Sequence, residues 1–196
     1  MPAARELRTQ RLLLRPWRPE DAVALHPVLE ANFAHLGPWI PARISTPAPI
    51  PELAQRLAGF AAEFADDREW RYGMFALDDG AVLGEVGLFP RSATARVPYL
   101  AADRVELGYW LREDQTGRGL VTEASRAVLA MAATLPRLSL VEIRCDARNA
   151  PSAAVPQRLG FVLASTVPDL AVTPTEPPIQ LQVWTSVLSH STATTR

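Results

Sequence analysis

The sequence contains no lysine, so all 20 of its basic residues are arginines. A Walker A loop and a Schiff-base enzyme both need a lysine, so these two classes are excluded. The three histidines, His26, His35 and His190, do not cluster, and no two have metal-ligand spacing. No Gly-x-Ser-x-Gly nucleophile motif is present. These absences leave chemistry that depends on binding two substrates and positioning them.

Cysteine occurs once, at Cys145. A single cysteine excludes an internal disulfide and is typical of a reducing compartment. No stretch approaches the roughly 20 apolar residues of a transmembrane helix, and the opening MPAARELRTQR lacks the apolar core of a secretory signal. The formal net charge is −1, so no overall field favours nucleic acid or an anionic membrane. We therefore expect a cytoplasmic protein that binds neither.

The chain has 196 residues, of which 48% are hydrophobic, enough for one globular core. Apolar periodicity predicts strands at 11–15, 72–77, 82–89, 106–111, 138–145, 161–165 and 179–188, and helices from Pro19 and at 52–64, 121–135 and 152–159. Pro27 predicts that the first helix is kinked or short. Asp78-Asp79-Gly80 predicts a hairpin turn. The proline-rich segments 37–51 and 166–178 are expected to be loops.

The strongest functional signal lies between Glu106 and Ala124. A strand-like run, ELGYWL, leads into a polar turn that contains Gly117-Arg118-Gly119, and an amphipathic helix follows at once. Backbone amides at a helix N-terminus bind anions, and glycine lets the chain come close to them. A glycine pair between a strand and a helix is also common in simple tight turns, so the pattern alone leaves both interpretations open. The dinucleotide fingerprint does not fit, because its third glycine position holds Thr122.

Three motifs together resemble the GNAT N-acetyltransferases. Gly117 and Gly119 fill the glycine positions of the family's acetyl-CoA pyrophosphate loop, Gln/Arg-x-x-Gly-x-Gly/Ala, although Asp114 replaces its first residue. The run GYWL…GRGLVTEA, the opening TQRLLLRPWRP and the closing NAPSAAVPQRLGF are similar to the ribosomal-protein N-terminal alanine acetyltransferase (RimJ/RimL-like) group. The resemblance implies a single α/β domain of GNAT fold over residues 9–188, with flexible tails at 1–8 and 189–196. Its sheet would be mixed and mostly antiparallel, with helices on both faces.

The resemblance also implies an enzyme that moves acetyl from acetyl-CoA directly to a primary amine, without a metal. The acceptor would be a protein N-terminal amine, or a small amine, amino acid or antibiotic, and a homodimer is left open. The implied acetyl-CoA contacts are Gln115, Thr116, Gly117, Arg118, Gly119, Leu120, Thr122 and Asn149. Three of these residues have ordinary alternatives: Arg118 as a solvated arginine, Thr122 as a helix-surface threonine, and Asn149 as a helix N-cap.

Catalysis by this route needs a base, because an amine is nucleophilic only after it has lost its proton. Glu106, on the strand before the glycine loop, matches a position where related enzymes carry the base, and Glu85 on the preceding strand is the alternative. Each of the two carboxylates could instead be paired with an arginine. Many GNAT enzymes protonate the departing thiolate with a tyrosine, but Pro156 occupies that position here, and Ser152 is the nearest hydroxyl.

The acceptor pocket is expected in the segments 33–51 and 166–178. Trp39 would line it or pack in the core. Cys145 is predicted to be a small core residue rather than a nucleophile. A second hypothesis is an acetyl-CoA-binding regulatory module without catalysis, which Asp114 and the missing tyrosine keep open.

Overall fold

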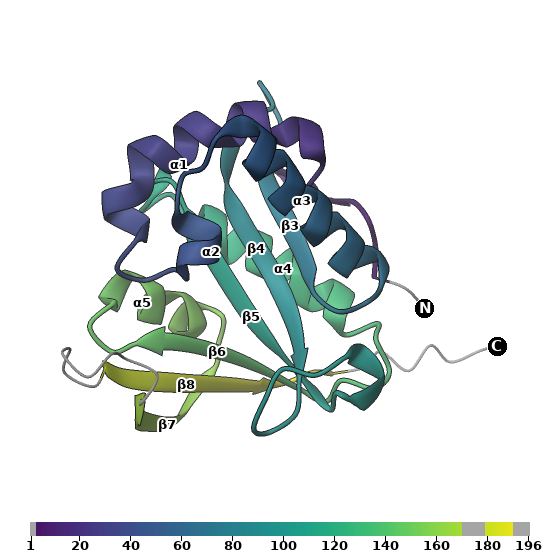
Figure 1. Ribbon diagram of the computed structural model, residues 1–196. Helices are drawn as coiled ribbons and strands as arrows, with labels where there is room; N and C mark the ends of the chain where they lie inside the picture. Colours follow the sequence, from purple (N-terminus) through teal and green to yellow (C-terminus); the bar gives the residue numbers. More distant parts are fainter. Residues whose placement is uncertain (1–2, 170–178, 190–196) are drawn as a thin grey trace.

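The computed structural model describes residues 3–169 and 179–189. One eight-stranded sheet, in the order β1-β2-β3-β4-β5-β6-β8-β7, forms the middle layer (Figure 1). Its strands are β1 (Leu7–Arg8), β2 (Leu12–Pro16), β3 (Trp70–Ala76), β4 (Val82–Arg91), β5 (Arg104–Leu111), β6 (Leu140–Asp146), β7 (Val162–Asp169) and β8 (Ile179–Val187). The helices are α1 (Ala22–Leu36), α2 (Ala42–Ser45), α3 (Ile50–Ala65), α4 (Leu120–Ala132) and α5 (Ala150–Arg158), with short 3-10 turns at Pro19–Asp21, Tyr99–Ala101 and Glu113–Gln115.

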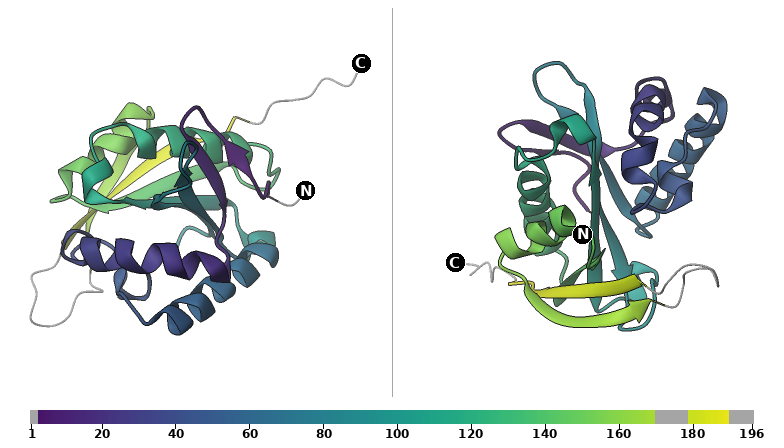
Figure 2. Two further views of the ribbon diagram at one scale, coloured as in Figure 1. Left: turned by 90° about the horizontal axis from the view of Figure 1, so that it is seen from above. Right: turned by 90° about the vertical axis from the view of Figure 1, so that its left-hand side faces the viewer.

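Helices cover both faces of the sheet (Figure 2). The pair α1 and α3 packs over β2, β3 and β4, and α4 packs against β4 and β5 on the opposite face. Each helix buries one apolar stripe at helical spacing; α3 buries Leu53, Leu57, Phe60 and Phe64, and α4 buries Leu120, Ala124, Val128 and Met131. Since β4 is covered on both sides, all of its residues are buried. The predicted mixed, mostly antiparallel α/β fold is confirmed.

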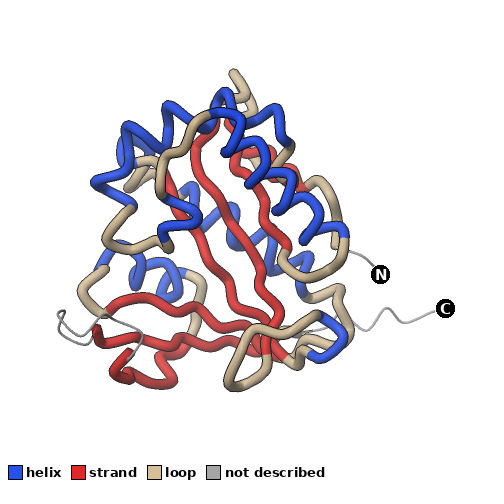
Figure 3. The backbone as a smooth tube through the Cα atoms, in the orientation of Figure 1, coloured by secondary structure: helices blue, strands red, loops and turns tan. Residues whose placement is uncertain are grey.

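One pair of neighbouring strands, β5 and β6, runs parallel. The two strands pair only where Arg104–Glu106 meet Leu140–Glu142. Beyond that point β5 continues to Leu111 against β4, and β6 continues to Asp146 against β8. The two strands therefore diverge and leave an opening beside five residues of β5, roughly 17 Å at the usual strand rise. The divergence is visible in Figures 1 and 3, with α5 behind the opening.

Two predicted elements are corrected. Pro27 does not shorten α1, which is one helix of 15 residues. The carbonyl that loses its amide partner belongs to Val23, which is 64% exposed, so water can replace that hydrogen bond. The predicted loop at 166–178 begins too early, because β7 continues to Asp169 in register with β8. Pro168 is tolerated there because β7 is an edge strand. Residues 170–178 lie outside the described part of the chain.

Part of the predicted N-terminal tail is built into the sheet. Leu7 and Arg8 pair with β2, and the hydroxyl of Tyr72 donates a 2.7 Å hydrogen bond to the carbonyl of Ala4. Residues 1–2 and 190–196 lie outside the described residues, so the domain limits stay a prediction. None of the helices in the described part of the chain is long and apolar enough to cross a membrane.

Candidate functional site

The glycine loop joins β5 to the N-terminus of α4. Gly117 and Gly119 have φ angles of 73° and 77°, in the left-handed region that favours glycine. A Cβ at Gly117 would meet no atom within 4 Å. Within the described residues, the amides from Gly117 to Thr122 have no hydrogen-bond acceptor. These unpaired donors, at the positive end of the helix dipole, fit the oxygens of a pyrophosphate.

The N-terminal segment ties this loop in place, a contact that the sequence analysis missed. Arg11 forms an ion pair of 2.6 Å with Glu123 in the first turn of α4 and donates a 3.0 Å hydrogen bond to the carbonyl of Arg118. Thr9 also donates to Glu123. Burial opposes ionisation of Glu123, but these donors hold its pKa below the usual range. The turn between β1 and β2 therefore supports the predicted phosphate site from outside the loop.

The remaining predicted loop residues are placed in different ways. Arg118 bonds the side chain of Gln115, and Thr116 donates to the carbonyl of Glu113, so these side chains shape the loop. Asp114 pairs with Arg112 at 2.8 Å, and that hydrogen bond lowers the pKa of Asp114. Thr122 is buried at 6% exposure, so it is not the helix-surface threonine of the alternative interpretation, and its contact with acetyl-CoA stays a prediction.

The N-terminus of α5 faces the other side of the opening. Asn149 is the N-cap of α5 and accepts a 3.1 Å hydrogen bond from the amide of Ser152, which confirms its capping role. Its contact with a pantetheine arm stays a prediction. Tyr109, on the diverging part of β5, donates a 2.9 Å hydrogen bond to the carbonyl of Ser152, and the two hydroxyls lie 3.4 Å apart. Burial raises the pKa of Tyr109, so it stays protonated at neutral pH. Tyr109 therefore links β5 to the start of α5, a pairing that no local sequence pattern indicates.

The two candidate bases differ in access. Glu85 is buried, and its oxygens accept hydrogen bonds from Arg71 at 2.8 Å and the indole of Trp17 at 2.7 Å. Glu106 is the last residue of β5 that pairs with β6. It therefore lies at the apex of the opening, the point from which the two strands diverge. Its oxygens accept from Arg91 and, at 2.8 Å, from Arg96, and its side chain is 15% exposed. A carboxylate oxygen has two lone pairs, so each oxygen of Glu106 keeps one for an amine or water.

Other sequence candidates are not brought into one cluster. Trp39 is 41% exposed in the turn after α1, and its part in an acceptor pocket stays a prediction. Residues 3–169 and 179–189 contain no group of three His, Cys, Asp or Glu side chains that could hold a metal ion. Cys145 is 7% exposed on β6, which confirms it as a core residue.

Replacing Cys145 with alanine should leave most of the activity. Burial raises the pKa of its thiol, although the nearby Ser152 and Trp184 side chains oppose this effect, so the reactive thiolate is scarce at neutral pH. Intact-protein mass spectrometry during turnover should show no acetyl adduct. An acetylated wild-type enzyme whose adduct disappears in Cys145→Ala would overturn direct transfer.

Comparisons with known proteins agree with this geometry. The model of the acetyltransferase (GNAT) domain family matches residues 11–162, more than half of the chain. The predicted ribosomal N-acetyltransferase YdaF of Bacillus subtilis (strain 168) is 26% identical over 153 residues, which cover 78% of this chain and 79% of YdaF.

Two solved structures show the same arrangement. One is RimL, the ribosomal L7/L12 alpha-N-protein acetyltransferase in complex with coenzyme A, at a TM-score of 0.78 and 19% identity, covering 92% of this chain and 96% of RimL. The other is the microcin C7 self-immunity acetyltransferase MccE with acetyl-CoA and AMP, at a TM-score of 0.77 and 15% identity, covering 91% of this chain and 93% of that one. At such identities the likeness shows a shared fold.

Proposed function

The chain belongs to the GNAT acetyltransferase family, and we propose that it joins its two substrates in the opening between β5 and β6. It is an acetyl-CoA-dependent N-acetyltransferase that acts on an amine. The observation that carries the proposed site is the combination of a free strand edge on β5 with the unpaired amides of the loop that follows it. Amides along the edge can hold an extended pantetheine arm, and the loop amides can hold its pyrophosphate. The comparisons give no support to a non-catalytic module.

The two ends of the opening then have different tasks. The pyrophosphate is bound at the glycine loop, after Leu111, and the thioester lies toward the apex, near Glu106. The amine nitrogen attacks the thioester carbonyl, a C–N bond forms, and the amine proton passes to Glu106 directly or through water. The C–S bond then breaks, and the sulfur leaves as a thiolate that takes up one proton. Glu85 is too deeply buried for this role.

A hydroxyl group beside the opening can supply the proton that the leaving thiolate needs. The Ser152 hydroxyl, which donates to the Tyr109 hydroxyl at 3.4 Å, can donate to the sulfur instead and regain a proton from water, while Tyr109 holds the Ser152 carbonyl. Ser152 thus replaces the tyrosine that Pro156 displaces from the usual position in the same helix. The proposal assigns the acid role to Ser152 and the positioning role to Tyr109.

The proposed acceptor is the free N-terminal amine of a protein, because relatives of this chain are named as ribosomal protein acetyltransferases. A small-molecule acceptor is the second candidate, since the microcin immunity enzyme has the same fold. A cytoplasmic location fits a chain with a single cysteine, and a homodimer stays open.

An acceptor screen tests the proposed function. Peptides with a free N-terminus should release CoA from acetyl-CoA and gain 42 Da, roughly one acetyl group, on the α-nitrogen, which fragmentation in the mass spectrometer locates. Each peptide also contains an internal lysine. The matched control has the same sequence, but its N-terminus is blocked. Acetylation of small amines alone, or of the lysine alone, would contradict a protein N-terminal acceptor.

A further inference from the structure

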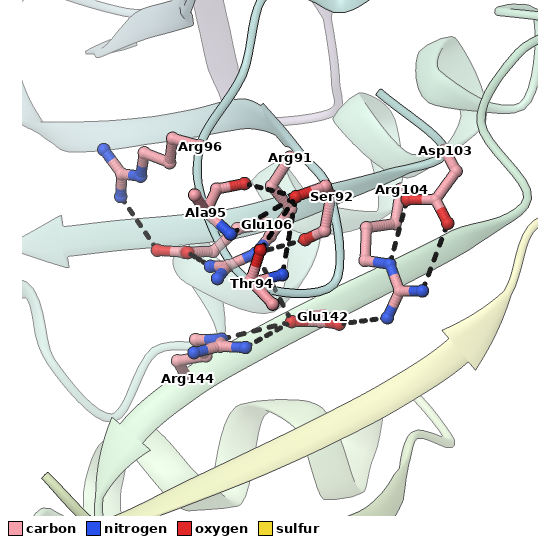
Figure 4. Close-up of polar contacts among 10 residues, drawn as sticks. All are labelled: Arg91, Ser92, Thr94, Ala95, Arg96, Asp103, Arg104, Glu106, Glu142 and Arg144. Atoms are coloured by element: carbon pink, nitrogen blue, oxygen red, sulfur yellow. Dashed lines mark hydrogen bonds and ion pairs between the residues drawn. The ribbon is translucent and has the colours of Figure 1, made fainter. Parts of the chain in front are cut away.

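Four arginines surround two glutamates on the sheet face opposite α4, at the apex of the opening (Figure 4). They come from three neighbouring strands and from the loop after β4. The glutamates are Glu106 and Glu142, which are direct partners across β5 and β6, and the arginines are Arg91, Arg96, Arg104 and Arg144. Side chains alternate between the two faces of a strand, so this group is separated from the apolar core beneath α4.

The contacts join the six side chains into one network. Arg91 bonds Glu106 and lies 3.7 Å from Glu142. Glu142 also accepts from Arg104 and from Arg144, each at 3.0 Å. Two of the arginines also pair with a carboxylate outside the six: Arg104 with Asp103 and Arg96 with Glu69. The four guanidinium groups are thus matched by four carboxylates, and what distinguishes the apex is which of these groups are exposed.

Among the six side chains of the network, those of Arg96 and Arg144 are the most exposed. The side chains of Glu142 and Glu106 are 4% and 15% exposed, whereas those of Arg144 and Arg96 are 26% and 43% exposed. Helices α1 and α3 pack over β2, β3 and β4 and leave this end of the face uncovered (Figure 2). In the described part of the chain, the exposed edges next to Glu106 and Glu142 are therefore those of Arg96 and Arg144, whereas the exposed carboxylate of Asp103 lies just before β5, beside Arg104.

Arg96 is held in a fixed position rather than free in solvent. Its guanidinium lies 4.1 Å from the centroid of the Phe89 ring, and Arg71 stacks on the same ring at 4.6 Å. Phe89 itself lies over the cross-strand glycines Gly87 and Gly108, where a Cβ would come within 2.7 and 3.0 Å of its ring. Arg96 also lies 3.4 Å from Glu69. An arginine fixed this way loses little entropy when it binds an anion.

We propose that the acceptor is a peptide N-terminus followed closely by acidic residues, which the exposed edges of Arg96 and Arg144 bind. The inference rests on the proposed function, because it takes Glu106 as the group that receives the amine proton. Arg96 bonds that same carboxylate at 2.8 Å, so an amine beside Glu106 brings the next one or two residues of its peptide to the guanidinium groups.

Three peptides that differ only in charge test this proposal. They begin Ala-Glu-Glu, Ala-Gln-Gln or Ala-Arg-Arg and are otherwise identical. An exposed ion pair contributes roughly fivefold, so two pairs predict a kcat/KM about 25-fold higher for the acidic than for the neutral peptide. The difference should arise mainly in KM and shrink as salt is added. The basic peptide should be the poorest substrate, because like charges meet at the apex.

Arginine variants locate the effect. In the double variant Arg96→Gln with Arg144→Gln, the acidic-to-neutral ratio should fall to about threefold or less, while thermal unfolding shows an intact fold. The ratio is the readout because any change in Glu106 itself affects all three peptides alike. The matched control is Arg126→Gln, which removes an exposed arginine from α4 on the other face and should keep the full ratio.

Two results would overturn the proposal while the proposed function survives. Equal kcat/KM for the three peptides would contradict an acidic acceptor, and an unchanged ratio in the double variant would contradict binding by Arg96 and Arg144. Failure of all three peptides while small amines are acetylated would contradict the protein acceptor and this proposal together.

Discussion

Replacing Glu106 with glutamine should lower kcat by about 10²–10⁴-fold, the usual loss when a general base is removed. Glutamine keeps the volume of the side chain, and its one carbonyl oxygen can still accept from Arg91 or from Arg96, but it cannot take a proton. Affinity for acetyl-CoA should stay near normal, because the phosphate loop begins five strand residues away, roughly 17 Å. Steady-state kinetics and calorimetry on the same preparation measure the two effects.

The pH dependence of this variant separates a base from a purely structural glutamate. Activity of Glu106→Gln should recover in part at high pH, where the free amine arrives without its proton. Glu85→Gln is the matched control: it changes a buried carboxylate held by Arg71 and Trp17, so it should lower the unfolding temperature and affect kcat less. Full kcat for Glu106→Gln at neutral pH would mean that the proton leaves by water or by another group.

Gly119→Glu should weaken acetyl-CoA binding at least tenfold, about 1.4 kcal/mol. The side chain would project from the turn whose unpaired amides are proposed to hold the pyrophosphate, and its charge would repel the phosphates. A φ of 77° at this position also strains any residue with a Cβ, so some of the loss comes from a displaced loop. Calorimetry measures the affinity and circular dichroism the fold.

Gly160→Glu separates these two contributions. Gly160 has a φ of 79°, and a Cβ there would meet no atom within 4 Å, whereas one at Gly119 would meet only the Arg11 guanidinium, at 3.9 Å; Gly160 follows α5 rather than preceding α4. Gly119→Glu and Gly160→Glu thus add the same charge at nearly the same φ angle, but only Gly119 lies in the loop that is proposed to hold the pyrophosphate. Equal losses in the two variants, or normal affinity in Gly119→Glu, would remove the glycine loop from the cofactor site.

The fold could be predicted largely from local patterns. The apolar stripe of α4 and the alternation in β2 and β8 are signals carried by neighbouring residues. The C′ glycine of α5 and the hairpin at Asp78-Asp79-Gly80 follow from turn chemistry, and both are confirmed. The extension of β7 to Asp169 could not be predicted, because its pairing with β8 overrides the turn signal of Pro168.

Some features of the candidate site could likewise be predicted from the sequence, and others could not. The positive φ angles of Gly117 and Gly119 and the cap of Asn149 could be read from the sequence, because each depends on a few adjacent residues. The support from Arg11 to Glu123 and the bridge from Tyr109 to Ser152 join residues 112 and 43 positions apart. No local pattern encodes such contacts in a single sequence. The arginine network around Glu106 is likewise a product of strand register, since it places Glu106 opposite Glu142.

Hydrogen exchange with and without acetyl-CoA tests most directly whether the opening between β5 and β6 is the cofactor site. The amides on the free edge of residues 107–111 and those of residues 117–122 lack acceptors in the described structure, so they should exchange rapidly without ligand. Saturating acetyl-CoA should slow exchange in both segments and leave β2 and β3 unchanged. Saturated binding that protects neither segment, or that protects a different region instead, would contradict this site.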